Sequence, residues 1–181
     1  MLSHVAFLVP SVAACARRLA GRFELGAIEE YPPTGTRELY VGANDSGSLL
    51  LMEAIGPGAY ERARAKRGFG LHHVAVDVAD PAAYVMEMGS TGWLLHPISL
   101  AHAQRGEPFF LARPGVKTLI EVQRLREGPP VKPFITRIEV ECESKLQHLP
   151  GALKVSGIVG AGETRLWIDE KPFALDELLR T

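Results

Sequence analysis

Two runs of this sequence repeat each other: His4-Val5-Ala6-Phe7-Leu8-Val9 and His73-Val74-Ala75-Val76-Asp77-Val78. Each is followed, at a matched interval, by one of a second pair of runs, Gly47-Ser48-Leu49-Leu50-Leu51-Met52-Glu53-Ala54 and Gly115-Val116-Lys117-Thr118-Leu119-Ile120-Glu121-Val122. The step from His4 to Glu53 is 49 residues and that from His73 to Glu121 is 48. The repeat predicts a duplicated module that begins near a histidine and ends near a glutamate.

The pattern around each histidine predicts a strand followed by a helix. Short apolar runs rich in β-branched residues are typical of buried strands. In the first copy Ser11 is a plausible N-cap for a helix from Val12 to about Ala20. In the second, Asp80-Pro81 supplies an N-cap and a proline in the first turn. Three strand-like runs then follow in each copy: 24–30, 37–41 and 49–55, then 93–98, 108–112 and 117–124.

Each copy therefore has the order βαβββ, and a four-stranded sheet with one helix leaves one face uncovered. We predict an α+β fold in which paired βαβββ modules form a cup-shaped mixed sheet with the helices outside. The paired domain spans 1–127, with modules at about 1–56 and 71–125, and 60–66 is a helix between them. After a break at Gly128-Pro129-Pro130, residues 130–181 form a C-terminal α/β extension, a partial third module being one interpretation.

In this extension we expect strands at 135–142, 153–159 and 164–169 and short helices at 144–148 and 175–179. It covers a sheet edge or a subunit interface, or else it shapes the mouth of the cup. 

Composition limits the function classes. A net charge of −1 offers no electrostatic basis for binding nucleic acid or an anionic membrane, and no run approaches the ~20 apolar residues of a membrane span. Val12-Ala13-Ala14-Cys15 looks like a lipoprotein cleavage site, but no Lys or Arg precedes the apolar run, so export is disfavoured. We expect a cytoplasmic protein, a homodimer, with a small-molecule substrate and no organic cofactor.

Facing modules would bring two histidines and two glutamates together. A carboxylate in an apolar strand costs free energy unless it is paired or bound to a cation. Two imidazoles and two carboxylates suit one divalent ion (Zn, Co, Ni, Mn or Fe), with positions left for substrate. We therefore predict a metal site of His4, Glu53, His73 and Glu121. His72, one residue from His73 along the strand, should point to the opposite face, and His96 lines the cup or ends a strand.

Several stretches resemble the vicinal-oxygen-chelate superfamily, which includes glyoxalase I, methylmalonyl-CoA epimerase and extradiol dioxygenases. The resemblance covers residues 2 to about 124 and is clearest for the epimerase branch. The stretches that carry it are His4-Val5-Ala6-Phe7-Leu8-Val9-Pro10, Lys66-Arg67-Gly68-Phe69-Gly70-Leu71-His72-His73-Val74-Ala75, Gly106-Glu107-Pro108-Phe109-Phe110-Leu111-Ala112-Arg113-Pro114 and Thr118-Leu119-Ile120-Glu121-Val122.

The resemblance implies that His4, His73 and Glu121 are metal ligands. It gives Glu53 the same role, although another register places Leu50 there. We prefer Glu53 because it aligns with Glu121 in the internal repeat without gaps. Gly35-Thr36-Arg37-Glu38-Leu39 resembles the epimerase strand that carries a catalytic base, so Glu38 is the candidate base, with Glu121 as a possible partner base. A solvent-facing Glu38 beside Arg37 is the alternative.

The leading hypothesis is a metal-dependent isomerase or lyase, epimerase-like or glyoxalase I-like, acting on a small carbonyl or acyl-thioester substrate through an enolate. An extradiol-type dioxygenase is one alternative, which Glu53 as a second carboxylate disfavours. A non-catalytic, resistance-type binding protein is the other. For a CoA ester, basic residues of the 60–66 region are candidate contacts, a solvated helix face being their other interpretation: Arg62, Arg64, Lys66 and Arg67.

Overall fold

The structure is a computed structural model that describes residues 1–42, 47–125, 132–146 and 153–180. In this part of the chain the strands form two sheets, ordered β2-β3-β4-β1-β5-β8-β7-β6 and β10-β9-β11-β12. The elements up to the end of the first sheet are β1 (Leu2–Leu8), α1 (Val12–Leu19), β2 (Leu25–Tyr31), β3 (Thr36–Val41), β4 (Ser48–Ala54), α2 (Ala59–Arg67), β5 (Gly70–Val78), α3 (Pro81–Gly89), β6 (Leu94–Leu95), η1 (Pro97–Ser99), α4 (Leu100–Gln104), β7 (Phe109–Arg113) and β8 (Val116–Arg124).

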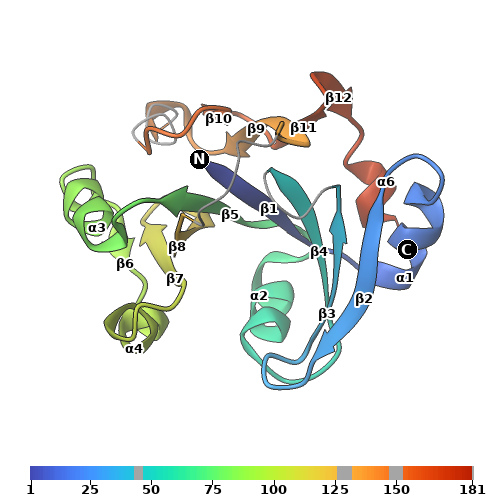
Figure 1. Cartoon of the computed structure of the whole chain (residues 1–181), viewed down its shortest axis with the longest axis horizontal. Helices are drawn as coiled ribbons and strands as arrows, with labels where there is room; N and C mark the ends of the chain where they lie inside the picture. The colour runs from blue at the N-terminus through green and yellow to red at the C-terminus, as the bar shows by residue number, and fades with distance from the viewer. Residues whose placement is uncertain (43–46, 126–131, 147–152, 181) are drawn as a thin grey trace.

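The eight-stranded sheet consists of two βαβββ modules, as the repeat predicts. In each module the first strand runs parallel to the last, β1 beside β4 and β5 beside β8. The modules join through antiparallel pairing of β1 with β5 at the centre of the sheet (Figure 1). The predicted α+β fold with paired modules is confirmed.

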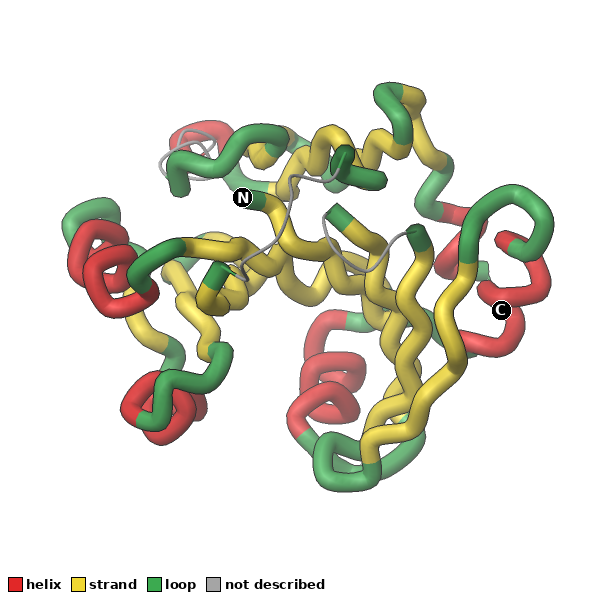
Figure 2. Tube along the Cα trace, viewed as in Figure 1, coloured by secondary structure: helices red, strands yellow, loops and turns green. Residues whose placement is uncertain are grey.

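Helix starts follow the capping residues seen in the sequence. The Ser11 hydroxyl accepts the Ala14 N–H at 3.2 Å, and α1 buries Val12, Cys15 and Leu19 at helical spacing. The Asp80 carboxylate accepts two N–H groups at the start of α3. Figure 2 shows both helices at the flanks of the large sheet.

The second module departs from the prediction between residues 93 and 104. The expected strand 93–98 shrinks to Leu94–Leu95, and the helical turns η1 and α4 follow. Pro97 has no N–H to give to a strand ladder. The His96 side chain instead accepts the Ile98 N–H, and the Ser99 hydroxyl accepts the Phe110 N–H at 2.9 Å. These local bonds turn the chain away from the sheet edge.

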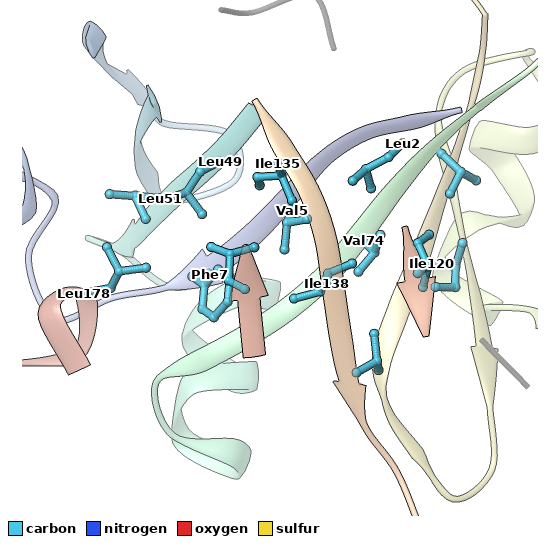
Figure 3. Close-up of a cluster of buried hydrophobic side chains, with 14 of the residues drawn as sticks. Leu2, Val5, Phe7, Leu49, Leu51, Val74, Ile120, Ile135, Ile138 and Leu178 are labelled. Carbon is cyan, nitrogen blue, oxygen red and sulfur yellow. The ribbon is translucent and has the colours of Figure 1, made fainter. Parts of the chain in front are cut away.

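The two faces of the large sheet differ in what covers them. On one face, which we call the outer face, side chains such as Val5, Phe7 and Leu51 join one large apolar core with residues of the extension (Figure 3). On the other, which we call the cup face, Ala6, Leu8, Leu50 and Met52 pack against Tyr60 and Ala63 of α2. Figure 1 shows α2 and the extension on opposite sides of the sheet.

The extension forms the second sheet and seals the outer face. Its elements are β9 (Ile135–Glu141), η2 (Ser144–Leu146), β10 (Ile158–Ala161), β11 (Arg165–Ile168), β12 (Lys171–Phe173) and α6 (Asp176–Leu179). Its first strand pairs with β10 and β11, whereas a module's first strand pairs with the module's last, so the described strands do not repeat the module's order. The strand expected at 153–159 begins only at Ile158. Residues 147 and 148 of the expected helix and the Gly128-Pro129-Pro130 break lie outside the described residues.

Several hydrogen bonds join the extension to the rest of the chain, three of them through backbone carbonyls. The Ile135 N–H donates to the Gly47 carbonyl at 2.6 Å, the Cys15 thiol to the Leu178 carbonyl, and the Tyr84 hydroxyl to the Leu153 carbonyl. The extension therefore contacts α1, α3 and the centre of the sheet. None of the helices in the described residues is long and apolar enough to cross a membrane.

We predict that removing a side chain between the two sheets destabilises the whole chain. Ile138→Ala empties a site that is 0% exposed and should lower the free energy of unfolding by about 2–5 kcal/mol. The matched control Ile98→Ala, at a site 55% exposed, should change it by less than about 0.5 kcal/mol. Urea unfolding followed by circular dichroism measures both. Equal effects would show that the extension does not share the core.

Candidate metal centre

His4 and His73 approach each other across the junction of the modules. In the antiparallel β1–β5 register His4 lies opposite Ala75, and Ala6 lies opposite His73. The histidines are therefore diagonal neighbours on one face of the sheet, where long side chains reach each other. Their Nε2 atoms are 3.2 Å apart, and both side chains are buried.

Glu121 completes the group from the neighbouring strand. Its partner across the parallel β5–β8 ladder is Ala75, which lies on the same face as His73. The Glu121 Oε2 is 3.1 Å from Nε2 of His73 and 3.5 Å from Nε2 of His4. One atom from each of three residues thus converges on one point. We call His4, His73 and Glu121 the triad.

The triad fits a divalent ion. Ligand atoms that each lie about 2.0–2.2 Å from one ion are roughly 3.0–3.5 Å apart, which is the spacing seen here. Three atoms that carry lone pairs repel at this distance unless protons or a cation lie between them. A buried cluster of this composition is what a metal site requires, since the imidazoles bind when neutral and the carboxylate when ionised.

Electrostatics favour a neutral His73 and an ionised Glu121. Burial lowers the pKa of His73, although Glu121 opposes this. Burial also acts to raise the pKa of Glu121, but hydrogen bonds from His4 and His73 outweigh it and hold that pKa well below the usual range. The carboxylate is therefore ionised at neutral pH.

Glu53, expected as the fourth ligand, does not reach the triad. It shares a face of β4 with Leu49 and Leu51, which is the outer face, whereas the triad lies on the cup face. Its Oε2 accepts the Val12 N–H at 2.9 Å, and Arg37 approaches both oxygens at 3.4 Å. A carboxylate at the first turn of a helix complements the helix dipole. The structure therefore places Glu53 in a helix-capping contact.

The strand registers identify which residue corresponds to Glu121 in the first module. His73 lies opposite Leu119 and Glu121 follows two residues later, while His4 lies opposite Ser48 and Leu50 follows two residues later. The equivalent position is thus Leu50, the alternative register that the sequence left open. Leu50 is 4% exposed and packs under α2. The described residues bring together three ligands, two imidazoles and one carboxylate.

Glu38 lies on the cup face of β3. It pairs with Met52 across the β3–β4 ladder and is half-buried. The Thr36 hydroxyl donates to Glu38 Oε1 at 2.9 Å. Burial raises the pKa of Glu38, Thr36 and His4 act to lower it, and the charge of Glu121 raises it further, so the carboxyl lies within electrostatic reach of the triad. Glu38 is therefore partly covered rather than fully exposed.

His72, which we expect on the face opposite to His73, lies at a bulge of the strand. Ala6 pairs with His73 and Phe7 pairs with Leu71, so His72 is the extra residue of β5. Its Nδ1 is 2.9 Å from Nδ1 of His73, and both rings are buried. Burial, then His73 and Arg67, lower the pKa of His72 to about 2, so its imidazole is neutral. The apolar sequence around it carries no signal of this bulge.

Aromatic rings frame the triad. Tyr40 meets His4 edge-on at 5.9 Å between ring centroids, and Phe110 meets His73 at 5.3 Å. Tyr60 of α2 lies against His72 at 5.0 Å, and burial together with Glu121 and Glu38 raises the pKa of its hydroxyl. Sequence reasoning missed Tyr60, because a lone tyrosine in a charged helix gives no hint that the helix lies over the cup. His96 instead caps η1.

Comparison with known proteins finds similarity in the structure but not in the sequence. The sequence matches no family model, and no curated protein is significantly similar to it. A hypothetical protein of Bacillus halodurans matches with a TM-score of 0.59 at 20% identity, over 72% of this chain and 98% of that one. A Streptomyces coelicolor methylmalonyl-CoA epimerase variant in complex with 2-nitronate-propionyl-CoA matches with a TM-score of 0.51 at 23% identity, over 71% and 98%. A methylmalonyl-CoA epimerase in complex with methylmalonyl-CoA and NH4+ matches with a TM-score of 0.52 at 24% identity, over 71% and 97%.

The chain has the vicinal-oxygen-chelate fold. The resemblance seen in the sequence, including the likeness to the epimerase branch, is confirmed at the level of fold. The match extends over almost the whole length of these vicinal-oxygen-chelate structures, whereas part of this chain lies outside it.

We predict that two glutamates which look equivalent in the sequence differ in metal retention. Glu121→Ala removes a triad atom and should abolish retention of a stoichiometric divalent ion, as should His4→Ala. Glu53→Ala should keep the metal and instead lower stability by about 1 kcal/mol through loss of the contact with α1. Metal analysis after gel filtration measures the first effect, and thermal unfolding measures the second. Loss of metal from Glu53→Ala would restore it as a ligand.

Proposed function

We propose that this chain is a divalent-metal-dependent isomerase or lyase that removes a proton from the carbon next to a carbonyl group of a small carbonyl or acyl-thioester substrate. The observation that carries the proposal is the joint presence, on one face of the sheet, of a three-ligand site and of a separate carboxylate whose pKa is raised by burial. The likeness to epimerases solved with CoA esters supports the substrate class.

His4, His73 and Glu121 would hold the ion, and the open positions would receive substrate oxygens. A bound divalent ion supplies electrophilic stabilisation of the negative charge that develops on a substrate oxygen. Zn, Co, Ni, Mn and Fe all remain compatible with two nitrogens and one oxygen.

Glu38 would act as the base. Its Oε1 accepts the Thr36 hydroxyl, which leaves Oε2 to take the proton from the substrate carbon. A raised pKa brings a carboxylate closer to the value that makes it an effective base near neutral pH. Glu121 is the less suitable proton carrier because His4 and His73 hold it ionised. We therefore give Glu121 the ligand role, and the acid that returns the proton in an epimerase stays unassigned.

An extradiol-type dioxygenase is the second candidate, and one observation favours it. With Leu50 at the fourth position and Glu53 on the outer face, the site has two histidines and one carboxylate. This set is typical of non-haem iron oxygenases. Glu38 distinguishes the two candidates, because ring cleavage of a catechol by oxygen does not require a carboxylate base at that position. A binding protein without metal is a third candidate, which the buried triad disfavours.

We predict that the metal-loaded chain exchanges an acidic α-hydrogen with solvent. Proton NMR in D2O would follow the loss of this signal for a panel of α-acidic carbonyl compounds, beginning with methylmalonyl-CoA. Glu38→Gln should retain the metal and slow exchange by about 10²–10⁴-fold, since it removes the base. Glu30→Gln is the matched control and should leave the exchange rate unchanged, because the Glu30 carboxylate of β2 pairs with Arg37 of β3.

Unchanged exchange in Glu38→Gln would eliminate the proposed base. Oxygen uptake with catechols by the Fe²⁺-loaded chain, without any hydrogen exchange, would favour the dioxygenase. A purified chain that retains no divalent ion would favour the binding protein.

The pH dependence of this exchange should show the environment of Glu38. The base works when ionised, so the rate should fall as the pH drops through a pKa above the ordinary glutamate value, because burial raises it. The Thr36 hydrogen bond acts to lower this pKa. Thr36→Val should therefore move the acidic limb of the kcat/KM profile to higher pH. A shift in the opposite direction would contradict the assignment of Glu38.

A further inference from the structure

His72 lies directly behind the triad. It is the extra residue at the bulge of β5, is 7% exposed, and brings its Nδ1 to 2.9 Å from Nδ1 of His73. The proposed function uses only Nε2 of His73. Among the described residues, the opposite ring nitrogen of His73 has another imidazole, that of His72, as its hydrogen-bonding partner.

The positions of the ring protons decide which imidazole donates the hydrogen bond between His72 and His73. A ligating imidazole needs a lone pair on the nitrogen that faces the ion, so His73 must carry its proton on Nδ1. That N–H then donates to Nδ1 of His72, which must be unprotonated there and carry its own proton on Nε2. The opposite arrangement would put the His73 proton on Nε2, between the ring and the ion.

We propose that His72 is a positioning residue, which selects the ligating tautomer of His73 and fixes the orientation of its ring through an imidazole–imidazole hydrogen bond. This inference rests on the proposed metal site. Outer partners of ligating histidines are commonly carboxylates, backbone carbonyls or waters, and their loss typically weakens metal binding by about 10–100-fold. Here a neutral ring takes that place.

The surroundings of His72 suit this role. The Tyr60 ring lies against it at 5.0 Å between centroids, tilted by 52°, which restricts its rotation. His72 also lines a cavity of about 240 Å³, together with Phe7, Arg67 and Thr118 and with Leu175 and Thr164 of the extension. A cavity of this size, lined in part by polar side chains, has room for water. Water in this cavity would serve as an acceptor for a proton on Nε2 of His72.

The test is the affinity for Zn²⁺, measured by competition with a chelating dye, in three variants and the unchanged chain. His72→Phe keeps a ring but removes the acceptor, and should weaken Zn²⁺ binding by about 10–100-fold. His72→Asn places an amide oxygen near the position of Nδ1, and should restore affinity to within about threefold of the unchanged chain. His102→Phe removes an exposed histidine paired with Glu107, and should leave affinity unchanged.

A second measurement does not depend on any variant. In the Zn²⁺-loaded chain labelled with ¹⁵N-histidine, His73 should carry its proton on Nδ1, and a scalar coupling between the two Nδ1 atoms should be visible across the hydrogen bond. A merely structural His72 would affect stability in thermal unfolding without this coupling and without rescue by Asn.

The outcomes are distinct. If the unchanged chain binds Zn²⁺ and His72→Phe binds it equally well, or if His73 carries its proton on Nε2, the role of His72 is wrong and the metal site stands. If the unchanged chain does not bind Zn²⁺, the metal site itself fails, and the role of His72 with it. Should His72→Phe not fold, the coupling and the Asn variant still decide.

Discussion

The antiparallel pairing of β1 with β5 is the contact on which the site depends. Each module ends its sheet at its own first strand, and each first strand carries one histidine. Pairing these two edges satisfies their backbone groups and places His4 and His73 diagonally on the same face. Two imidazoles buried beside a carboxylate are costly unless protons or a cation link them. The pairing that completes the sheet thus also brings together groups that a divalent ion would link.

The two modules share one strand order but carry different functional side chains. The second module supplies two triad members, His73 and Glu121, and the outer partner His72. The first supplies His4 and, on β3, the carboxylate of Glu38. At the position equivalent to Glu121 the first module has Leu50, which packs under α2 rather than facing an ion. In the proposed mechanism this asymmetry separates the triad, which would hold the ion, from Glu38, which would move the proton.

Hydrophobic patterning and the repeat predict most of the fold, because a short apolar run has few alternatives to a buried strand. They also predict three of the site's residues, since His4, His73 and Glu121 lie at equivalent ends of paired strands. Glu53 was misassigned because an alignment without gaps counts residues along the chain, whereas the face of a strand depends on its register. Glu121 and Leu50 are equivalent in register, and Glu53 is on the other face.

A bulge of one residue at His72 is a related case, since it interrupts the alternation that assigns a side chain to a face. Nothing in Gly70-Leu71-His72-His73 distinguishes a regular strand from a bulged one. Likewise, the run 93–98 is apolar enough for a strand. The strand is short because the side chains of His96 and Ser99 form local hydrogen bonds on either side of the turn at Pro97. Such features depend on contacts between segments, which periodicity does not record.

The extension bears on the site although it lies on the opposite face. Ile135 and Ile138 of β9 belong to the same core as Val5 of β1 and Val74 of β5, the strands that carry the histidines (Figure 3). A ligand site needs its atoms held to within about 0.5 Å, and packing on both sides of a strand supplies that rigidity better than one. The outer layer therefore contributes to the geometry of the triad through the strands that carry its histidines.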